Sequence, residues 1–331
     1  MAVFTPVTAT DLAAFLMQYD VGIATSFKGI AEGVQNSNFL VETTRGRFIL
    51  TLYEERVDLD DLPWFLALMT HLADKSLPVP RPVTDRDGMA LQMLNGRPAC
   101  MIEFVTGVSV SEPSPDHCHA MGAALGRLHA ATVDFRQPRP NSLGVAAWPA
   151  MVDRCDGRFA EIDSQLATII NDGLAATRKW PVGLPGGAVH TDLFPDNVLL
   201  SGTTVTGLID FYFACTDAHA YDYAVTHAAW CFSAVGAVHY PERAAALAAG
   251  YAETKGLSAA EIAALPRLGE GAALRFTLTR AFDWINTPPG ALVTRKDPMA
   301  FARRLQWYAR ATPAMVLGAI SMRLPQSCGD D

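Results

Sequence analysis

Short apolar runs alternate with polar turns along the first hundred residues. Asn95-Gly96 stands between two such runs, and this dipeptide is the strongest short signal for a β-hairpin. Apolar residues over 59–73 recur with helical spacing and have a proline near their start. A shorter amphipathic helix is expected over 10–19. The pattern therefore predicts two hairpins with a helix between them, with strands over 34–43, 47–53, 89–94 and 98–105.

After the hundredth residue the spacing becomes mainly helical. Two short apolar runs over 198–200 and 205–209, around Ser201-Gly202-Thr203, predict one further hairpin. We therefore expect an α+β chain in two lobes, a small antiparallel sheet lobe over residues 1–103 and a mainly helical lobe over 104–331. The expected helices cover 117–132, 151–179, 221–237, 241–255, 259–284 and 298–310.

The composition narrows the class of protein. A chain of 331 residues, half of them apolar, is long enough for two lobes with separate cores. It has no run of 18 apolar residues and no signal-peptide order at its start, so we expect no membrane association and a cytoplasmic location. Its six cysteines form no CxxC pair, which argues against structural zinc. A net charge of −8 without basic runs argues against a nucleic-acid partner.

Polar residues gather on either side of the hairpin predicted in the second lobe. The run His190-Thr191-Asp192-Leu193-Phe194-Pro195-Asp196-Asn197 precedes the hairpin, and Ile209-Asp210-Phe211 ends it. Phosphoryl transfer needs a carboxylate to receive the hydroxyl proton and oxygen ligands for a metal ion on the phosphates. Asp192 is the predicted base. Asn197 and Asp210, which the hairpin brings together, are the predicted ligands of Mg²⁺.

Each piece of this pattern has an ordinary structural interpretation when taken alone. An HxD sequence in a loop is commonly a pair of turn residues, and an aspartate that ends a strand is commonly a cap. The full order of HxDxxxxN, a hairpin and an apolar-Asp-aromatic strand end favours a kinase. His190 then corresponds to the histidine of the HRD loop in protein kinases, which packs and hydrogen-bonds rather than reacts.

These residues resemble the aminoglycoside phosphotransferase and choline kinase-like superfamily, and within it the type II homoserine kinases. The superfamily resemblance rests on the motif from His190 to Asn197, on Asp210 and on residues 217–224. The resemblance implies a two-lobed protein-kinase-like fold, ATP with Mg²⁺, and phosphorylation of the hydroxyl of L-homoserine. The narrower resemblance rests on the stretches 36–41, 48–54, 77–82, 96–100 and 294–298.

The nucleotide is expected in the sheet lobe and at its exit. A loop with two glycines, followed by short polar side chains, could offer amide and hydroxyl donors to phosphate oxygens, although any tight turn also needs glycine. In kinase-like folds the crossing between the lobes presents backbone groups to adenine. The residues expected at the nucleotide are Gly33, Asn36, Ser37, Asn38, Glu103 and Val105.

The third strand departs from the usual kinase pattern. Many kinases carry a Lys or Arg there to pair with the α- and β-phosphates. This chain has Thr51 at that position, and a neutral hydroxyl cannot replace the charge. Lys28 is the nearest candidate in sequence for the missing cation. Asp61, at the start of the next helix, has no evident cationic partner and is expected to favour the helix N-terminus.

The acceptor site must suit a zwitterion if the substrate is homoserine. It needs a cationic group for the carboxylate and an acidic or carbonyl group for the ammonium. Arg280 and Asp283 are i,i+3 neighbours on a predicted helix and are the expected pair, although such pairs are more often surface ion pairs. Asp217 and Asp222 are expected to brace the catalytic loop and to begin the following helix.

Two alternatives stay open at this point. One is a kinase for another small hydroxylated cation, such as choline or an aminoglycoside, and a quaternary ammonium would require several aromatic faces. The other is a catalytically inactive nucleotide-binding protein of the same fold. Thr51 favours this second alternative, while the intact set of Asp192, Asn197 and Asp210 argues against it. The sequence does not specify an oligomeric state.

Overall fold

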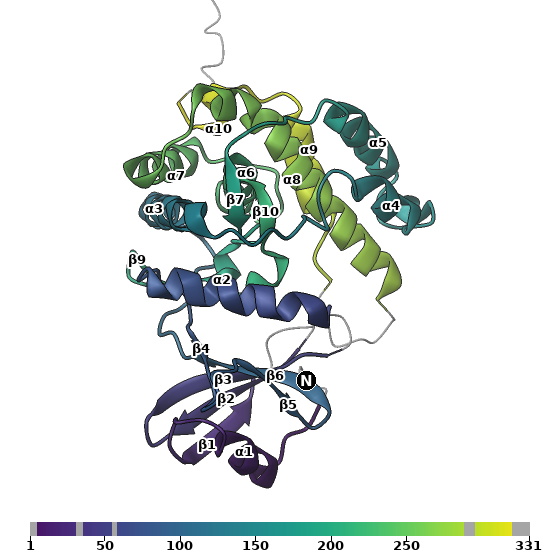
Figure 1. Cartoon of the computed structure of the whole chain (residues 1–331). Helices are drawn as coiled ribbons and strands as arrows, with labels where there is room; N and C mark the ends of the chain where they lie inside the picture. Colours follow the sequence, from purple (N-terminus) through teal and green to yellow (C-terminus); the bar gives the residue numbers. More distant parts are fainter. Residues whose placement is uncertain (1–4, 31–35, 55–57, 288–294, 320–331) are drawn as a thin grey trace, which may run out of the picture.

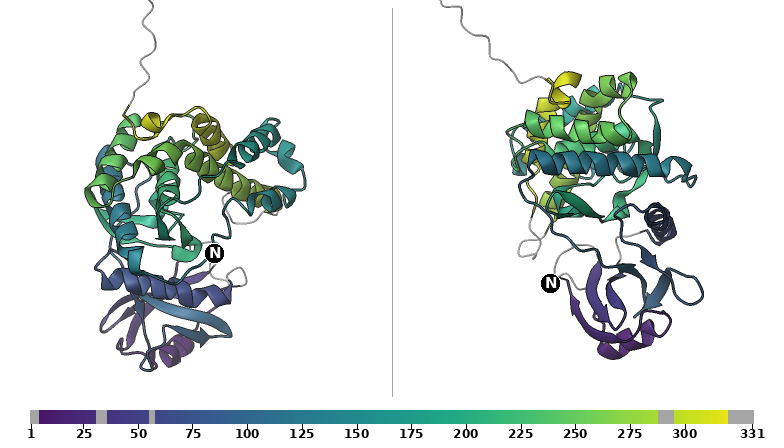
Figure 2. Two further views of the ribbon diagram at one scale, coloured as in Figure 1. Left: turned by 45° about the horizontal axis from the view of Figure 1, so that its top comes forward. Right: turned by 90° about the vertical axis from the view of Figure 1, so that its left-hand side faces the viewer.

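The chain folds into a sheet lobe and a helical lobe that lie one against the other, with α2 (Leu62–Asp74) between them (Figures 1 and 2). A computed structural model describes residues 5–30, 36–54, 58–287 and 295–319. The sheet has six antiparallel strands in the order β1-β2-β3-β6-β4, and β5 also pairs with β6. The strands are β1 (Ala24–Gly29), β2 (Ser37–Thr43), β3 (Gly46–Leu52), β4 (Pro82–Val83), β5 (Leu91–Leu94) and β6 (Arg97–Glu103).

Both hairpins predicted in the first lobe are confirmed. Thr43 pairs with Gly46 across the first turn, and Leu94 pairs with Arg97 across the second. Asn95 and Gly96 adopt φ values of 50° and 76°, the left-handed pair that a tight two-residue hairpin requires. The alternation of apolar residues and the Asn95-Gly96 turn therefore both favour the observed register of β5 and β6.

Two helices flank the sheet lobe in different ways. α1 (Ala9–Leu16) buries Leu12 and Phe15 against one face of the sheet, in a core that includes Val41 and Leu50. α2 (Leu62–Asp74) lies between the sheet and the helical lobe (Figure 1), and its buried side chains belong to the core of the helical lobe. The segment from α2 therefore connects the two lobes through shared packing.

The helical lobe differs from the prediction in several places. The expected helix over 151–179 is interrupted because Asp156 and Gly157 have φ values of 50° and 69°, which a right-handed helix cannot include. The expected helix over 221–237 ends at Trp230, and Gly236 approaches the backbone of Ala300 so closely that any Cβ would collide. A short sheet of β7 (Gly186–Val189) and β10 (Cys215–Ala218) was not predicted. The helices are α3 (Pro115–Ala131), α4 (Trp148–Asp153), α5 (Leu166–Thr177), α6 (His219–Trp230), α7 (Pro241–Thr254), α8 (Ala259–Asn286), α9 (Met299–Tyr308) and α10 (Pro313–Val316).

The segment that follows β6 and crosses between the lobes, which includes Gly107 and Val108, packs against the hairpin of β8 (Val198–Ser201) and β9 (Thr204–Leu208). The amides and carbonyls of Val108 and Leu200 exchange hydrogen bonds of 3.0 and 2.9 Å. Gly107 has a φ of 156°, and a Cβ there would lie 2.4 Å from the Thr206 hydroxyl. The crossing can approach the hairpin this closely because Gly107 has no side chain. The residues at the two ends of this hairpin are thereby fixed relative to the sheet lobe.

Candidate active site

Asp222 holds the start of the loop that follows β7. One oxygen of its fully buried carboxylate accepts the Thr191 amide at 2.7 Å. The other oxygen accepts the His190 amide at 2.9 Å and lies 3.0 Å from Nε2 of His129. Burial acts to raise the pKa of Asp222, but the hydrogen bonds from His129 and the loop amides outweigh it and hold this pKa below its ordinary range. Asp222 therefore braces the loop, whereas Asp217 bonds to Asn141 and to the Ala218 amide.

Arg275 supports the same loop from α8 and was not among the residues predicted from the sequence. Its Nη1 donates to the Thr191 carbonyl at 2.7 Å, and the side chain is only 1% exposed. Thr191 has a φ of 61°, a left-handed conformation that a non-glycine residue adopts only when its surroundings impose it. The signal that marks Arg275 in the sequence is a charge that directly follows Ala272, Ala273 and Leu274 and precedes Phe276, all of them buried.

The three predicted catalytic residues lie together beyond this brace. The Asn197 amide nitrogen donates to the Asp192 carbonyl at 2.8 Å and to the Asp192 carboxylate at 3.1 Å. This orientation leaves Oδ1 as the remaining polar atom of the Asn197 amide. The Ile209 amide donates to the Asn197 carbonyl at 3.1 Å, so Asp210, the next residue, is held at the same place. Asp210 has a φ of 66° and begins the 3₁₀ turn Phe211–Phe213.

His190 links the two ends of this arrangement. Its Nδ1 accepts the Asp192 amide at 3.3 Å, so its Nε2 donates to the Ile209 carbonyl at 3.0 Å. Burial lowers the pKa of His190 to about 4, and the ring stays neutral at physiological pH. Both nitrogens of this neutral ring are engaged by the backbone of the loop and of the strand end that carries Asp210.

The carboxylates of the site destabilise one another. Burial raises the pKa of Asp192 to about 8, and the charges of Asp210 and Asp196 add to the rise. The protein atoms packed around Asp210 raise its pKa to about 6, although its side chain still reaches solvent. Within the described parts of the chain, no three His, Cys, Asp or Glu side chains could hold an ion by themselves. The donors suit a hard cation that brings its other ligands with it, as Mg²⁺ does when bound to phosphates.

Comparison with known proteins identifies the family of the chain. Residues 26–257 match the model of the phosphotransferase enzyme family. Homoserine kinases of Methylobacterium radiotolerans and Xanthobacter autotrophicus are 52% and 50% identical to this chain, with 96% of this chain and 99% of each relative covered. The chain belongs to the homoserine kinase family. It is therefore an ATP-dependent kinase that phosphorylates homoserine.

Solved structures share the fold at low identity. An amicoumacin kinase in complex with AMP-PNP, Ca²⁺ and its ligand superposes with a TM-score of 0.66 at 16% identity, covering 92% of this chain and 94% of that one. A spectinomycin phosphotransferase in complex with ADP and spectinomycin gives 0.62 at 12% identity, covering 95% and 98%. The predicted two-lobed α+β kinase-like fold is thereby confirmed.

The residues predicted to contact the nucleotide are engaged within the sheet lobe. Ser37 is fully buried, and its hydroxyl donates to the Glu54 carboxylate at 2.7 Å. The side-chain oxygen of Asn36 accepts the Glu54 amide at 3.4 Å. Thr51 donates to the side-chain oxygen of Asn38 at 2.8 Å, so the hydroxyl that replaces the usual cation is itself bonded to a predicted nucleotide residue. Gly33 lies outside the described residues.

The predicted adenine-contacting segment directly follows the last strand of the sheet. Glu103 ends β6, and its amide donates to the Arg81 carbonyl at 2.9 Å. Val105 follows it, and its side chain would lie 2.7 Å from a Cβ at Gly207 on the β8–β9 hairpin. The backbone at Glu103 and Val105 therefore lies between the sheet and the hairpin that carries Asn197 and Asp210.

Two lysines lie on the elements around the predicted nucleotide site. Lys28 is exposed on β1 opposite Leu40, and the strand register puts it on the same face as Asn38 and Thr51. Lys296 was not predicted, and its Nζ lies 3.3 Å from the Asp196 carboxylate. The charge of Lys296 acts to lower the pKa values of both Asp192 and Asp210.

The expectation that Asp61 lacks a cationic partner is wrong. Its carboxylate lies 2.5 Å from Nη2 of Arg139. The same guanidinium donates to the Ala214 carbonyl at 2.7 Å and stacks 4.6 Å from the centre of the Phe65 ring. The two partners are 78 residues apart in sequence, so no local pattern could have indicated the pair. Arg139 thus ties the start of α2 to the segment after the β8–β9 hairpin.

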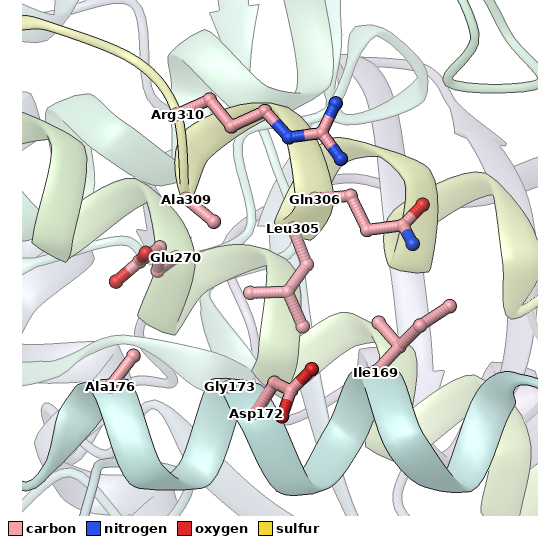
Figure 3. A pocket seen from close by; sticks show the side chains of 9 residues that line it. All are labelled: Ile169, Asp172, Gly173, Ala176, Glu270, Leu305, Gln306, Ala309 and Arg310. Carbon is pink, nitrogen blue, oxygen red and sulfur yellow. The ribbon is translucent and has the colours of Figure 1, made fainter.

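A hollow of about 190 Å³ opens beside the catalytic loop, at Phe194 and Pro195. Arg280 lines it, whereas Asp283 is exposed one turn further along α8 and is not among the described lining residues. A second hollow lies between α5, α8 and α9 around Leu305 (Figure 3). The first hollow lies beside Phe194 and Pro195 of the loop that carries Asp192, whereas the described lining of the second hollow contains no residue of this loop.

No helix in the described part of the chain is both long enough and apolar enough to cross a membrane.

Proposed function

We propose that the chain transfers the γ-phosphoryl group of ATP to the hydroxyl of L-homoserine, giving O-phospho-L-homoserine and ADP, with Asp192 as the base. The observation that carries the residue assignment is the cluster of Asp192, Asn197 and Asp210 at one end of the β8–β9 hairpin. The intact cluster argues against the inactive-protein alternative. The relatives at about 50% identity favour homoserine over choline or an aminoglycoside.

Asp192 would receive the proton of the attacking hydroxyl. The Asn197 amide, which donates to its carboxylate at 3.1 Å, keeps the side chain in one orientation. Asp222 and Arg275 hold the backbone on either side of Thr191, immediately before Asp192. Such positioning is the main contribution a protein can make to phosphoryl transfer, because the reaction requires little covalent assistance.

Asn197 Oδ1 and the Asp210 carboxylate would hold Mg²⁺ on the nucleotide phosphates. The bound ion would neutralise charge that develops on the transferred phosphoryl group. The raised pKa values of Asp192 and Asp210 fit a site whose carboxylates need a cation nearby. The amicoumacin kinase structure, which holds AMP-PNP with Ca²⁺, supports a nucleotide bound together with a divalent ion.

We also propose that the enzyme acts in the cytoplasm.

The acceptor preference tests the proposed substrate. L-Homoserine should have the highest kcat/KM in a panel with its methyl ester, N-acetylhomoserine, L-serine, L-threonine, choline and an aminoglycoside, measured by ADP release at one ATP and Mg²⁺ concentration. Blocking either charged end leaves a buried partner unpaired, which rejects such analogues strongly. L-Serine and L-threonine place the hydroxyl one carbon closer and should react poorly. A higher kcat/KM for choline or the aminoglycoside would contradict the homoserine assignment.

A second prediction concerns the cation that Thr51 does not supply. Lys28→Ala should raise the KM for ATP several-fold and leave the KM for homoserine unchanged, because the lysine lies on the same sheet face as Thr51. Steady-state kinetics with each substrate varied in turn measure both constants. Arg45→Ala is the control, since this exposed cation of the same sheet pairs with Asp20. If Lys28→Ala changes neither constant and Lys296→Ala raises the KM for ATP, the role belongs to Lys296.

A further inference from the structure

Two arginines beside the catalytic loop share one aromatic ring. The guanidinium carbons of Arg280 on α8 and Arg304 on α9 lie 4.5 and 4.2 Å from the centre of the Phe301 ring. Phe301 is itself 5.8 Å from Phe194 of the catalytic loop, measured between ring centres. Both arginines line the hollow at Phe194 and Pro195. Two positive charges therefore lie close together in the hollow beside Phe194 and Pro195.

Neither arginine forms an ion pair within the described parts of the chain. Arg304 is only 4% exposed, donates one hydrogen bond to the Ser233 carbonyl at 3.0 Å, and has a buried Nε without a partner. Arg280 donates to the Asp297 carbonyl at 3.3 Å. Burial lowers the pKa of each to about 10, and the charge of Arg280 adds to the effect on Arg304. Burying a charge without a partner is energetically unfavourable, so a protein rarely keeps one without a use.

The other charged residues that line the hollow add no net charge. Its described lining contains a third arginine, Arg243, and a single carboxylate, that of Glu112. Those two lie 3.5 Å apart and offset each other. The remaining charge is that of Arg304 and of Arg280, on which the carboxylates of Asp297, Asp196 and Asp192 act without forming an ion pair within the described residues. An anionic group of the ligand would supply the missing partner.

We infer that Arg304, together with Arg280, binds the carboxylate of the acceptor and sets the preference for an amino acid over a simple amino alcohol. This inference rests on the proposed homoserine kinase activity and adds the residues that recognise the substrate's anionic end. Phe194 and Pro195, which line the hollow together with the two arginines, follow Asp192 in the sequence by two and three residues. A carboxylate at the arginines would thus leave the other end of a short acceptor near the base. The expected pair of Arg280 and Asp283 is thus replaced by Arg280 and Arg304, which come from two different helices.

The test compares two acceptors that differ only in the carboxylate. These are L-homoserine and 3-aminopropan-1-ol, which has a hydrogen in its place. Arg304→Met should lower kcat/KM for L-homoserine by roughly 10²-fold, since a buried charge-assisted contact is lost, and leave the value for 3-aminopropan-1-ol unchanged. The melting temperature should not fall, because the substitution removes an unpaired buried charge. Arg303→Met is the matched control, since Arg303 is the adjacent residue on α9 and is partly exposed beside Asp297.

Other results would overturn the inference. An equal fall for both acceptors would assign Arg304 a structural role, and no fall for either would place the carboxylate elsewhere. Arg304→Lys keeps the charge without the planar guanidinium group and should lower kcat/KM for L-homoserine about 10-fold. This variant replaces Arg304→Met in the test if Arg304→Met does not fold. Calorimetric binding of L-homoserine should weaken in the same order. If the unmodified protein fails to phosphorylate L-homoserine at all, the proposed function fails instead, and the two failures are distinguishable.

Discussion

Asp192→Asn should lower kcat by roughly 10²–10⁴-fold, the loss typical of removing a positioned general base. The amide keeps the shape of the side chain but cannot receive a proton, while Asp222 and Arg275 continue to hold the loop backbone. Calorimetric affinity for Mg·ATP should be largely retained. Turnover is measured by ADP release with saturating ATP and L-homoserine.

The stability of the same variant gives an independent readout. Because burial raises the pKa of Asp192 to about 8, the carboxyl group favours its neutral form in the absence of nucleotide. A neutral Asn should therefore melt at the same temperature as the original protein or higher. Asp172→Asn makes the same chemical change at an exposed position on α5 and should affect neither property. Near-normal turnover in a folded Asp192→Asn protein would remove Asp192 from the base role.

Asp210→Ala should nearly abolish turnover and weaken Mg²⁺-dependent binding of ATP, because it removes the one carboxylate assigned to the metal. Asp210 has a φ of 66°, so alanine also introduces backbone strain. Asp210→Gly removes the same carboxylate in a conformation that glycine adopts readily. The two variants should lose activity equally, although only the alanine variant should be less stable.

The control for Asp210 is Asp156→Ala. Asp156 is also an exposed aspartate with a positive φ, 50°, but it lies in the turn after α4. It should lose a similar amount of stability and keep full activity. Unchanged affinity for Mg·ATP with a normal rate in Asp210→Gly would show that the metal is bound by other residues.

The sequence by itself determined the features that depend on neighbouring residues. Asn95-Gly96 specified a hairpin because only a few residues accept two successive left-handed conformations. The order from His190 to Asn197, a short hairpin and then Asp210 was sufficient to bring these residues together, because a two-strand turn returns the chain to its starting point. The helix predicted over 151–179 failed for the opposite reason, since apolar spacing does not register a left-handed turn at Asp156 and Gly157.

Only the tertiary structure decided which charged residues act together. Arg139 meets Asp61 across 78 positions, and Arg275 reaches Thr191 across 84. Arg304 and Arg280 face one hollow because α8 and α9 pack against each other around Phe301. Such contacts depend on how helices pack, and each partner alone is an ordinary charged residue on a helix. Burial then determines the chemistry, because it leaves a charge such as that of Arg304 in need of a partner, and burial exists only once the whole chain has folded.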